Sequence, residues 1–537
     1  MKILVAQFNP KVGDLEQNAS SIIEIIEQGQ SAAADLIIFP ELALCGYPPE
    51  DLLLRPSLKI RVDRTLAKVA AAVSSSVVVL GYPSSEGERL YNAAAVIEKG
   101  ELITSYRKRV LPNYRVFDEK RYFSEGDSSC VFAVCGYKIG ITICEDLWHD
   151  EPIRDTANNG AELIVNINAS PFQGRKYQQR IDILVDQSMK VGLPILYANL
   201  VGGQDELVFD GDSMLINGAG EICYQAPWFE ESADILDLSF SATGVEMTAK
   251  ISVVPDRIEA TYKALVLAVK DYVEKNGFAT VILGLSGGID SAVTLAVAVD
   301  ALGADRVRAI MMPFQYTSAL SQNLASKQAE TMGVHYRSID IESIFEVFSE
   351  ALEDEFKGLP ADVTEQNMQA RIRGVILMSI SNKKGALVLT TGNKSEVAVG
   401  YSTLYGDMAG GFDVLKDVLK TRVYELAEWR NTLSAVIPEE VITRPPTAEL
   451  APDQVDQDSL PDYPELDQIL ENYIEKDMSA KDIVALGFSE EVVNRMVRLV
   501  DLNEYKRRQA PIGPRVSQRA FGRDRRYPIT NGWKPGD

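Results

Sequence analysis

The feature that most constrains this chain is the segment VILGLSGGIDSA at residues 281–292. Apolar and β-branched residues precede two adjacent glycines, as in a short buried parallel strand, and an Ala-rich run with helical spacing follows them. Glycines let backbone N–H groups crowd against an anion, and the N-terminus of a helix adds partial positive charge. The segment therefore predicts a strand, a tight turn and a helix suited to bind phosphate, although an ordinary strand-to-helix turn would look similar.

The polar side chains of this turn point to nucleotide chemistry. Ser286 and Ser291 can donate hydroxyl hydrogen bonds, whereas Asp290 suits a phosphate site only with a cation between the two anions. No Gly-Lys-Ser or Gly-Lys-Thr follows, so the turn is not a Walker loop. The hexapeptide SGGIDS resembles the pyrophosphate loop of the N-type ATP pyrophosphatases, which split ATP between its α and β phosphates. The resemblance implies ATP binding by Gly284, Leu285, Ser286, Gly287, Gly288, Ile289, Asp290 and Ser291.

Length and composition limit the possible classes of protein. A chain of 537 residues is long enough for two or more domains, and no apolar run approaches the length of a membrane span. The five cysteines include no metal-type CxxC pair, and the N-terminus enters a strand-like alternation without a signal peptide, so we expect reduced thiols and a cytoplasmic protein. The net charge of −23 disfavours nucleic acid as a partner. With two histidines, catalysis has to rely largely on carboxylates, lysine, cysteine and bound cations.

The first half of the chain alternates strand-like and helical patterns, which predicts a layered α/β region. Glu41, Lys108 and Cys144 lie near the ends of strand-like runs, where α/β folds build their sites. A thiol becomes a nucleophile with a base beside it and a cation where oxyanion charge develops, and these three residues can fill those roles. Singly, each also fits a structural role as a cap, a solvated charge or a small buried side chain. The strand-like runs are 3–8, 36–39, 77–80, 93–97, 138–143, 163–168 and 195–199, and the helical ones are 18–33, 57–73 and 178–191.

Three separated motifs connect these residues to a known family. FPELALCGYPPEDLL, YRKRVLPNYRVFDEKRYF and ICEDLW, in this order, resemble the nitrilase, or carbon–nitrogen hydrolase, superfamily over residues 1–220. The resemblance implies a nitrilase-like αββα sandwich with Glu41 as general base, Lys108 as oxyanion stabiliser and Cys144 as nucleophile. The backbone N–H of Glu145 would complete the oxyanion hole. The family reaction on an amide is attack by the thiolate, release of ammonia and hydrolysis of a thioester.

Members of this superfamily that use glutamine hold its α-amino and α-carboxylate groups. The resemblance assigns this role to Tyr114, Ser170 and Lys176. Arg175 stands beside Lys176, so either cation can face the carboxylate. Loop packing is the alternative role for Tyr114 and Ser170. Glu119 is a candidate second carboxylate near the thiol.

The pattern weakens between residues 224 and 255, and we place a domain boundary near residue 250. This gives a glutaminase domain at 1–250 and a nucleotide-binding domain at 251–537. After the SGGIDS turn, strands and helices alternate as in a doubly wound parallel sheet, Rossmann-like and of the adenine nucleotide alpha hydrolase type. Glu396 follows a strand end at Thr391 and is a candidate second Mg²⁺ ligand beside Asp290, because Mg²⁺ takes one or two carboxylates with phosphates and water. Its alternative role is a helix cap.

The rest of the second half narrows the resemblance. STLYGDMAGGFDVLKDVLKTRVYELA, RPPTAEL and YKRRQAPIGPRVSQRAFGRDRRYPI resemble the NAD synthetases, and with the amidase half the chain resembles the glutamine-dependent NAD synthetases. The family reaction is the ATP-dependent amidation of deamido-NAD (nicotinic acid adenine dinucleotide) to NAD through an adenylated intermediate. Glutamine supplies the ammonia, Mg²⁺ is the cofactor, and AMP, pyrophosphate and glutamate are released. The family also implies a homo-oligomer with small-molecule substrates and no membrane or nucleic-acid partner.

This resemblance extends to individual positions. Leu404 stands where the ammonia-only synthetases carry a lysine before YGD, so a dinucleotide contact is lost or supplied elsewhere. The C-terminal block of arginines in an acidic chain suggests contact with a dinucleotide or a neighbouring subunit, with a solvated tail as the alternative. The implied contacts are Thr391, Lys420 and Thr447 for ATP, Asn367, Glu396, Asp413 and Lys506 for deamido-NAD, and Asp290 and Glu396 for the metal.

Other functions are compatible with parts of the sequence. The same pair of chemistries could serve another acceptor, as in enzymes of GMP or asparagine type, but the motifs after the pyrophosphate loop argue against this. A nucleic-acid modifier that adenylylates a base would not suit the acidic balance, and we find no RNA-binding module. A non-catalytic binding protein would not need both motif sets.

Overall fold

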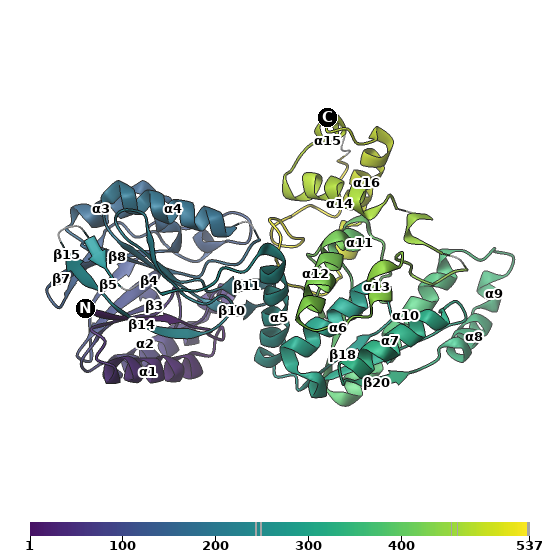
Figure 1. Cartoon of the computed structure of the whole chain (residues 1–537), viewed down its shortest axis with the longest axis horizontal. Coiled ribbons are helices and arrows are strands. Elements are labelled where there is room, and N and C mark those ends of the chain that lie inside the picture. The colour runs from purple at the N-terminus through teal and green to yellow at the C-terminus, as the bar shows by residue number, and fades with distance from the viewer. Residues whose placement is uncertain (175, 242–243, 248–249, 453, 459, 534–537) are drawn as a thin grey trace. The chain divides into compact units, whose positions relative to one another are not determined.

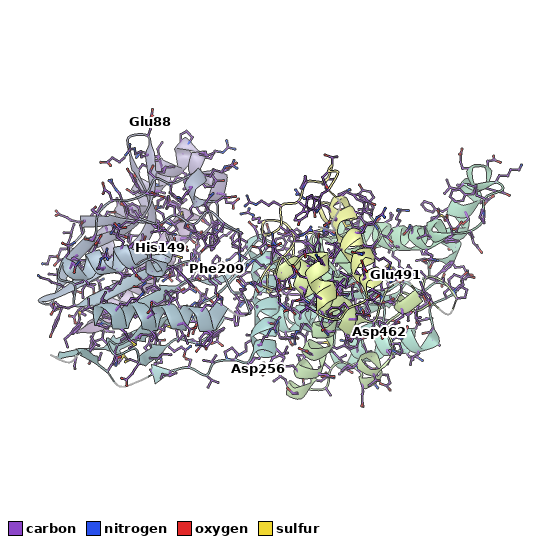
Figure 2. All side chains as sticks on the ribbon, turned by 90° about the horizontal axis from the view of Figure 1, so that it is seen from above. Glu88, His149, Phe209, Asp256, Asp462 and Glu491 are labelled. Atoms are coloured by element: carbon purple, nitrogen blue, oxygen red, sulfur yellow. The ribbon has the colours of Figure 1, made fainter. Side chains whose placement is uncertain are left out.

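The computed structural model describes residues 1–174, 176–241, 244–247, 250–452, 454–458 and 460–533. The chain divides into two compact units, Met1–Pro255 and Asp256–Asp537 (Figure 1), a few residues after the position inferred from the sequence. Asp256, labelled in Figure 2, caps the first helix of the second unit by accepting hydrogen bonds from the N–H groups of Ile258 and Glu259. Within the described residues, no helix is both long and apolar enough to cross a membrane.

The first unit contains two sheets, each with parallel strands at its centre. The orders are β14-β1-β2-β3-β4-β5 and β17-β13-β12-β9-β8-β7-β6. Strands β1 to β3 run parallel, as do β7 to β9, and antiparallel strands flank both groups. The first sheet consists of β1 (Lys2–Gln7), β2 (Leu36–Ile38), β3 (Val77–Glu86), β4 (Arg89–Glu98), β5 (Glu101–Arg107) and β14 (Ser232–Asp237), and the second of β6 (Cys130–Val134), β7 (Tyr137–Ile143), β8 (Leu163–Asn168), β9 (Ile195–Asn199), β12 (Met214–Ile216), β13 (Ile222–Gln225) and β17 (Lys250–Ile251).

Alternating side chains show how the layers of this unit pack. Leu4 of β1 belongs to a buried cluster with Ile22 of α1, whereas its neighbour Ile3 belongs to a cluster with Ile141 of β7. A third cluster joins β8 to α4, so the two sheets face each other and helices cover both outer faces (Figure 1). This is the αββα sandwich implied by the resemblance. The covering helices are α1 (Leu15–Ser31), α2 (Pro56–Ala72), α3 (Asp150–Asn158) and α4 (Lys176–Val191).

The acidic segment in which the sequence pattern weakens is part of the first unit. Its strand β14 pairs with β1 over six residues, from Lys2 opposite Asp237 to Gln7 opposite Ser232. This strand is partly exposed and contains acidic residues, so its sequence SADILD does not show the alternation of apolar and polar residues typical of a strand. Two hairpins that the sequence analysis did not single out also belong here, formed by β10 (Val201–Gln204) with β11 (Leu207–Asp210) and by β15 (Ser239–Ser241) with β16 (Gly244–Glu246).

The second unit is built on a parallel sheet with the order β20-β19-β18-β21-β22. The chain runs outward from β18 in one direction and then returns to add β21 and β22 on the other side, which makes the sheet doubly wound and confirms the fold class. The reversal lies between β18 and β21, where such sheets bind ligands at the carboxyl ends of their strands. The strands are β18 (Thr280–Gly284), β19 (Val307–Met311), β20 (His335–Ser338), β21 (Ala386–Thr390) and β22 (Phe412–Asp413).

Helices cover the sheet, and a further helical group follows it. Partly buried side chains of α8 and buried ones of α10 pack in one cluster with β18, β19 and β21. Helices α5, α6 and α12 contact one another, and α6 also contacts β18 and β19. The later helices share a core with α11. The helices are α5 (Arg257–Lys275), α6 (Ile289–Leu302), α7 (Ala319–Thr331), α8 (Glu342–Ala351), α9 (Glu353–Phe356), α10 (Val363–Lys384), α11 (Lys394–Val399), α12 (Lys420–Leu433), α13 (Glu439–Thr443), α14 (Tyr463–Leu470), α15 (Ala480–Ala485), α16 (Glu490–Leu502) and α17 (Glu504–Arg507).

Candidate active sites

A buried lysine joins two carboxylates in the first unit. Lys108 Nζ lies 2.7 Å from Glu41 Oε1 and 2.8 Å from Glu119 Oε1. Asn92 Nδ2 donates to both glutamates, and the Tyr47 hydroxyl donates to Glu119 at 2.8 Å. Burial raises the pKa of Glu119 to about 7. Burial lowers the pKa of Lys108, but the charges of Glu119 and Glu41 outweigh it and hold that pKa well above its ordinary value, so the lysine is a cation.

Close backbone packing holds Glu41 in place. Glu41 lies three residues beyond β2, and its Oε2 accepts a hydrogen bond from the N–H of Ala169 at 2.8 Å. Its backbone lies against Gly81 of β3, where an added Cβ would be 2.3 Å from the oxygen of Pro40 and 2.8 Å from the carbonyl carbon of Glu41. A side chain at position 81 would therefore displace the carboxylate.

Asp146 ties the turn after β7 to the loop that carries Lys108. Its Oδ1 accepts hydrogen bonds from the N–H groups of Arg109 and Val110 at 3.0 and 2.8 Å. Its Oδ2 accepts from the N–H of Ile143 at 2.9 Å. The aspartate of the CEDLW motif thus fixes the strand end that precedes the thiol relative to the lysine. The sequence analysis did not identify this role.

Cys144 is the first residue of a short 3-10 helix (Cys144–Trp148) that follows β7. Its φ of 46° lies in the left-handed region, which non-glycine residues adopt rarely and which is common at functional sites. The thiol is buried, and burial together with the charge of Glu41 raises its pKa well above the ordinary value, against the opposing effect of Lys108. The resting group is therefore a neutral thiol that needs a base in order to attack.

Two of the predicted glutamine-binding residues converge on one aromatic ring. The half-exposed Tyr114 donates its hydroxyl to Glu145 at 3.0 Å, and its ring centroid lies 5.6 Å from that of Phe117. Lys176, at the start of α4, places Nζ 5.8 Å from the Phe117 centroid. Arg175, the other candidate cation, lies outside the described residues.

Ser170 is buried two residues after β8, next to Ala169, whose N–H donates to Glu41 Oε2. The N–H of Ser170 donates to Asn199 Oδ1 at 2.9 Å, and its side chain hydrogen-bonds Tyr197. Burial raises the pKa of Tyr197, although the charge of Arg180 lowers it. The structure thus gathers the predicted catalytic and glutamine-binding residues of the first unit in one region.

The pyrophosphate-type loop in the second unit has the geometry expected from its glycines. The turn at residues 285–288 joins β18 to α6. Gly287 has a φ of +81°, and an added Cβ would lie 2.3 Å from the oxygen of Ser321. Ser286 Oγ and Ser291 Oγ lie 3.1 Å apart, and the N–H of Gly288 donates to Ser286 Oγ at 3.2 Å. The loop is closed by its own hydroxyls, and only glycine fits at position 287.

The two predicted metal-binding carboxylates share one ammonium group. Lys420 Nζ donates to Asp290 Oδ2 and, at 3.0 Å, to Glu396 Oε1. Asn393 Nδ2 donates to the other oxygen of Asp290 at 2.9 Å. Burial raises the pKa of Glu396 to about 8, although Lys420 lowers it. The carboxylates of Asp290 and Glu396 thus converge on the Lys420 ammonium. Two carboxylates fit Mg²⁺, which takes phosphate and water as its other ligands. The described residues form no cluster of three metal-binding side chains, so these other ligands would have to come from ATP and water.

The other polar residues of the TGNKSE segment are structural. Lys394 is buried and pairs with Asp417 and Glu475 at 2.9 and 2.7 Å. Ser395 Oγ accepts a hydrogen bond from the N–H of Lys420 at 2.9 Å. Asn393 caps α11 by accepting from the N–H of Glu396 at 3.0 Å. The segment therefore fixes both Glu396 and the start of the helix that carries Lys420.

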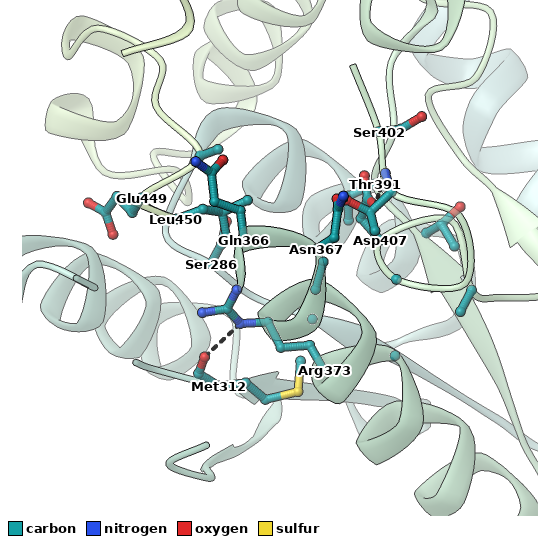
Figure 3. Close-up of a pocket in the computed structure, with 18 of the residues that line it drawn as sticks. Ser286, Met312, Gln366, Asn367, Arg373, Thr391, Ser402, Asp407, Glu449 and Leu450 are labelled. Carbon is teal, nitrogen blue, oxygen red and sulfur yellow. Dashed lines mark hydrogen bonds between the residues drawn. The ribbon is translucent and has the colours of Figure 1, made fainter. Parts of the chain in front are cut away.

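A cavity of about 810 Å³ opens at the carboxyl ends of β18, β19 and β21 (Figure 3). Such a volume is typical of small-molecule sites. Arg373 projects into it with Nε bound to the oxygen of Met312 at 3.0 Å, and burial lowers its pKa to about 10. Of the predicted residues, Gly284, Leu285, Ser286, Thr391, Asn367 and Lys506 line the cavity, whereas Gly287, Gly288, Ile289, Asp290, Ser291, Glu396, Asp413, Lys420 and Thr447, all described by the structure, are not part of its lining.

The sequence analysis missed several lining residues. Gln366, Ser402, Asp407, Glu449 and Leu450 all line the cavity and are labelled in Figure 3. They come from α10 and from loops around residues 402–407 and 448–454. Ser402 and Asp407 lie in the STLYGDMAGG motif, and Glu449 and Leu450 lie in RPPTAEL, so these motifs marked the loops but not which of their residues reach the cavity.

Most of the basic tail pairs within the second unit. Lys506 Nζ donates to the backbone oxygens of Gly400 and Ser402 at 2.8 and 3.0 Å, and burial lowers its pKa. Arg371 Nε donates to the oxygen of Leu404 at 3.2 Å, so a cation lies beside the position at which the ammonia-only synthetases carry a lysine. Nearby carboxylates pair with five of the tail arginines, namely Arg507, Arg508, Arg515, Arg519 and Arg525.

Comparison with known proteins assigns each of the two units to a family. Residues 2–244 match the family model for carbon-nitrogen hydrolase, and residues 261–510 match that for NAD synthase. The chain therefore joins an amidase of the nitrilase superfamily to an NAD synthase domain. It belongs to the family of glutamine-dependent NAD(+) synthetases, since it is 52% identical to the Acinetobacter baylyi member over 100% of this chain and 99% of the relative.

Other relatives agree over the full length. The Aquifex aeolicus glutamine-dependent NAD(+) synthetase is 43% identical over 99% of both chains. The Acinetobacter baumannii synthetase, solved in complex with ADP, is 48% identical with a TM-score of 0.81 and covers 100% of this chain and 99% of its own. The Cytophaga hutchinsonii synthetase, 22% identical with a TM-score of 0.85 over 99% and 98% of the two chains, shows the fold alone.

Proposed function

We propose that this enzyme amidates deamido-NAD to NAD with ATP, and that its first unit supplies ammonia from glutamine. The observation that carries the proposal is that one chain holds two chemically different groups of side chains. One contains a thiol, a buried carboxylate and a buried ammonium, and the other an anion-binding turn beside a large cavity. Family membership supports this reading.

In the first unit, Glu41 is the general base and Cys144 the nucleophile. Glu41 takes the thiol proton as the sulfur attacks the side-chain carbonyl of glutamine. Lys108 and the backbone N–H of Glu145 stabilise the oxyanion. The proton passes to the departing nitrogen, ammonia leaves, and water hydrolyses the thioester to glutamate. Lys108 is suited to its role because its contacts keep it charged although it is buried.

Recognition of glutamine is assigned to the residues around this thiol. Tyr114, through Glu145, and Lys176 face the glutamine α-amino and α-carboxylate groups. Ser170 follows Ala169, whose N–H donates to the carboxylate of Glu41, and this supports a place for Ser170 next to the substrate.

In the second unit, Ser286 of the turn and Ser291 in the first turn of α6 bind the phosphates of ATP, and Thr391 binds ATP from the end of β21. The nicotinate carboxylate of deamido-NAD attacks the α phosphate, pyrophosphate leaves, and ammonia then displaces AMP from the adenylate. Asn367 and Lys506 hold deamido-NAD in the cavity, which both residues line. The complex of a 48% identical synthetase with ADP supports nucleotide binding here.

The proposed metal site consists of Asp290 and Glu396. Mg²⁺ bound there would neutralise charge on the phosphates of ATP. In the described structure both carboxylates contact Lys420. We assign to Lys420 the task of keeping these carboxylates together and of contributing a positive charge to the phosphate site. We extend the proposal to a cytoplasmic location and a homo-oligomeric state, which rest on cysteine usage and family resemblance.

The proposed function is tested by product analysis. The purified protein is incubated with ATP, Mg²⁺, glutamine and deamido-NAD, and we expect NAD, AMP, pyrophosphate and glutamate in equal amounts. Ammonium salt in place of glutamine should also give NAD, without glutamate. Formation of ADP and phosphate in place of AMP and pyrophosphate would contradict the adenylated intermediate.

A further inference from the structure

A buried arginine lies on the helix that begins with Lys176, one of the proposed glutamine-binding residues. Arg180 is on α4, one helical turn after Lys176, so both residues lie on the same side of the helix. Its side chain is 2% exposed. Nη2 contacts both oxygens of Asp210 at 3.0 and 3.1 Å, and Nη1 contacts Asp212 Oδ2 at 3.0 Å.

Two sets of contacts lead from this arginine to Ser170. Asp210 Oδ1 accepts a hydrogen bond from Asn199 Nδ2 at 3.2 Å, and Asn199 Oδ1 in turn accepts from the N–H of Ser170 at 2.9 Å. The Arg180 guanidinium also lies 5.4 Å from the ring centroid of Tyr197, which hydrogen-bonds the Ser170 side chain. The first set fixes the backbone of Ser170 and the second fixes its hydroxyl.

Stability alone does not explain so many buried charges. A buried ion-pair network is often no more stabilising than apolar residues of the same volume, because its groups must be desolvated. What the network offers is fixed geometry, since a guanidinium donates in a rigid plane and each aspartate accepts along defined directions. Here that geometry joins the start of α4, the hairpin strand β11 and the ends of β8 and β9.

We propose that Arg180 is a positioning residue for glutamine, acting through Asp210, Asn199 and Tyr197 on Ser170 and through α4 on Lys176. The inference rests on the proposed function of the first unit and adds a specificity role to it. Arg180 has no part in the thiol chemistry, because its contacts are with Asp210, Asp212 and Tyr197 rather than with the groups around Cys144. Its loss should therefore weaken recognition of glutamine and leave the use of free ammonia intact.

The test uses two variants of the full-length protein and one control. Tyr197→Phe removes only the hydroxyl that contacts Ser170, and Arg180→Lys keeps the charge but loses the planar donor geometry. Thr65→Val is the control, because it also removes a buried hydroxyl, one whose hydrogen bonds stay within α2. For each protein, KM and kcat are measured with glutamine, and the rate of NAD formation is measured with saturating ammonium salt.

We expect both variants to raise KM for glutamine about tenfold, with kcat changed less and the ammonia-dependent rate within about twofold of the wild type. Thr65→Val should change none of these values. An unchanged KM in Tyr197→Phe overturns the inference even if Arg180→Lys does not fold. Equal losses with both nitrogen donors also overturn it, since they indicate general destabilisation. Cys144→Ala separates a failure of the proposed function from a failure of this inference. If Cys144→Ala still uses glutamine, the proposed function fails. If it uses only ammonia and Tyr197→Phe leaves KM for glutamine unchanged, only the role of Arg180 fails.

Discussion

Removing the buried ammonium of Lys108 should lower the free energy of unfolding by a large amount that depends on pH. Lys108→Met takes away the cation that lies 2.7 Å from Glu41 and 2.8 Å from Glu119, all three side chains being buried. Removing one partner of a buried ion pair typically costs about 3–5 kcal/mol. A carboxylate left without its partner can take up a proton instead, and protonating a carboxyl of pKa about 4.3 at pH about 7.5 costs about 4 kcal/mol. The two estimates agree, so we expect the free energy of unfolding of Lys108→Met to be about 4 kcal/mol lower than that of the wild type near neutral pH.

The same reasoning fixes how this cost changes with pH. A carboxyl that stays protonated in the folded variant stabilises it at low pH, and this stabilisation is lost as the pH rises. The stability of Lys108→Met should therefore approach that of the wild type as the pH is lowered. At pH about 5.5 the loss should shrink to about 1.5 kcal/mol. The assay is denaturant unfolding of both proteins at the two pH values, with Lys59→Met, which breaks an exposed pair with Asp63, as the control. A Lys108→Met variant no less stable than Lys59→Met, or a loss independent of pH, would refute the reasoning.

Three further predictions concern single residues. Gly287→Ala should reduce NAD formation about a hundredfold with either glutamine or ammonium, because its Cβ would lie 2.3 Å from the oxygen of Ser321 and force the ATP loop to move; near-normal rates would contradict this. Burial raises the pKa of Glu119, so the free energy of unfolding of the wild type should fall as the pH rises from 4.5 to about 7. Glu119→Gln should remove this fall, and a pH profile identical to that of the wild type would exclude the explanation. Lys506→Ala should raise KM for deamido-NAD and leave KM for glutamine unchanged, and steady-state kinetics with each substrate varied would show an equal change in both if the residue served only the fold.

Short motifs were enough to predict the parts of the molecule that depend on local geometry. The turn from Ser286 to Ser291 was predictable because two glycines between an apolar strand and a helix leave few other conformations. The doubly wound sheet followed from the alternation of strands and helices. The sandwich of the first unit came from a family resemblance, since periodicity alone does not say how two sheets stack.

What the sequence could not supply are contacts between distant segments. The binding of Asp290 by Lys420 joins positions 130 residues apart, and no spacing rule connects them. Asp146 was visible as part of a motif, but its hydrogen bonds to the loop after Lys108 are a property of the folded chain. The ion pairs of the tail arginines are a further example, because their carboxylates come from Asp477 and from Asp501 of α16 as well as from the tail itself.

The central claim is that one chain contains two reactions that are linked only by ammonia. It is tested most directly by Cys144→Ala, assayed for NAD formation with glutamine and with ammonium salt. The variant lacks the nucleophile but keeps the ATP loop and cavity of the other unit, so we expect glutamine-dependent synthesis to fall by several orders of magnitude and ammonia-dependent synthesis to remain near the wild-type rate. A variant that still uses glutamine at a near-normal rate would contradict the account.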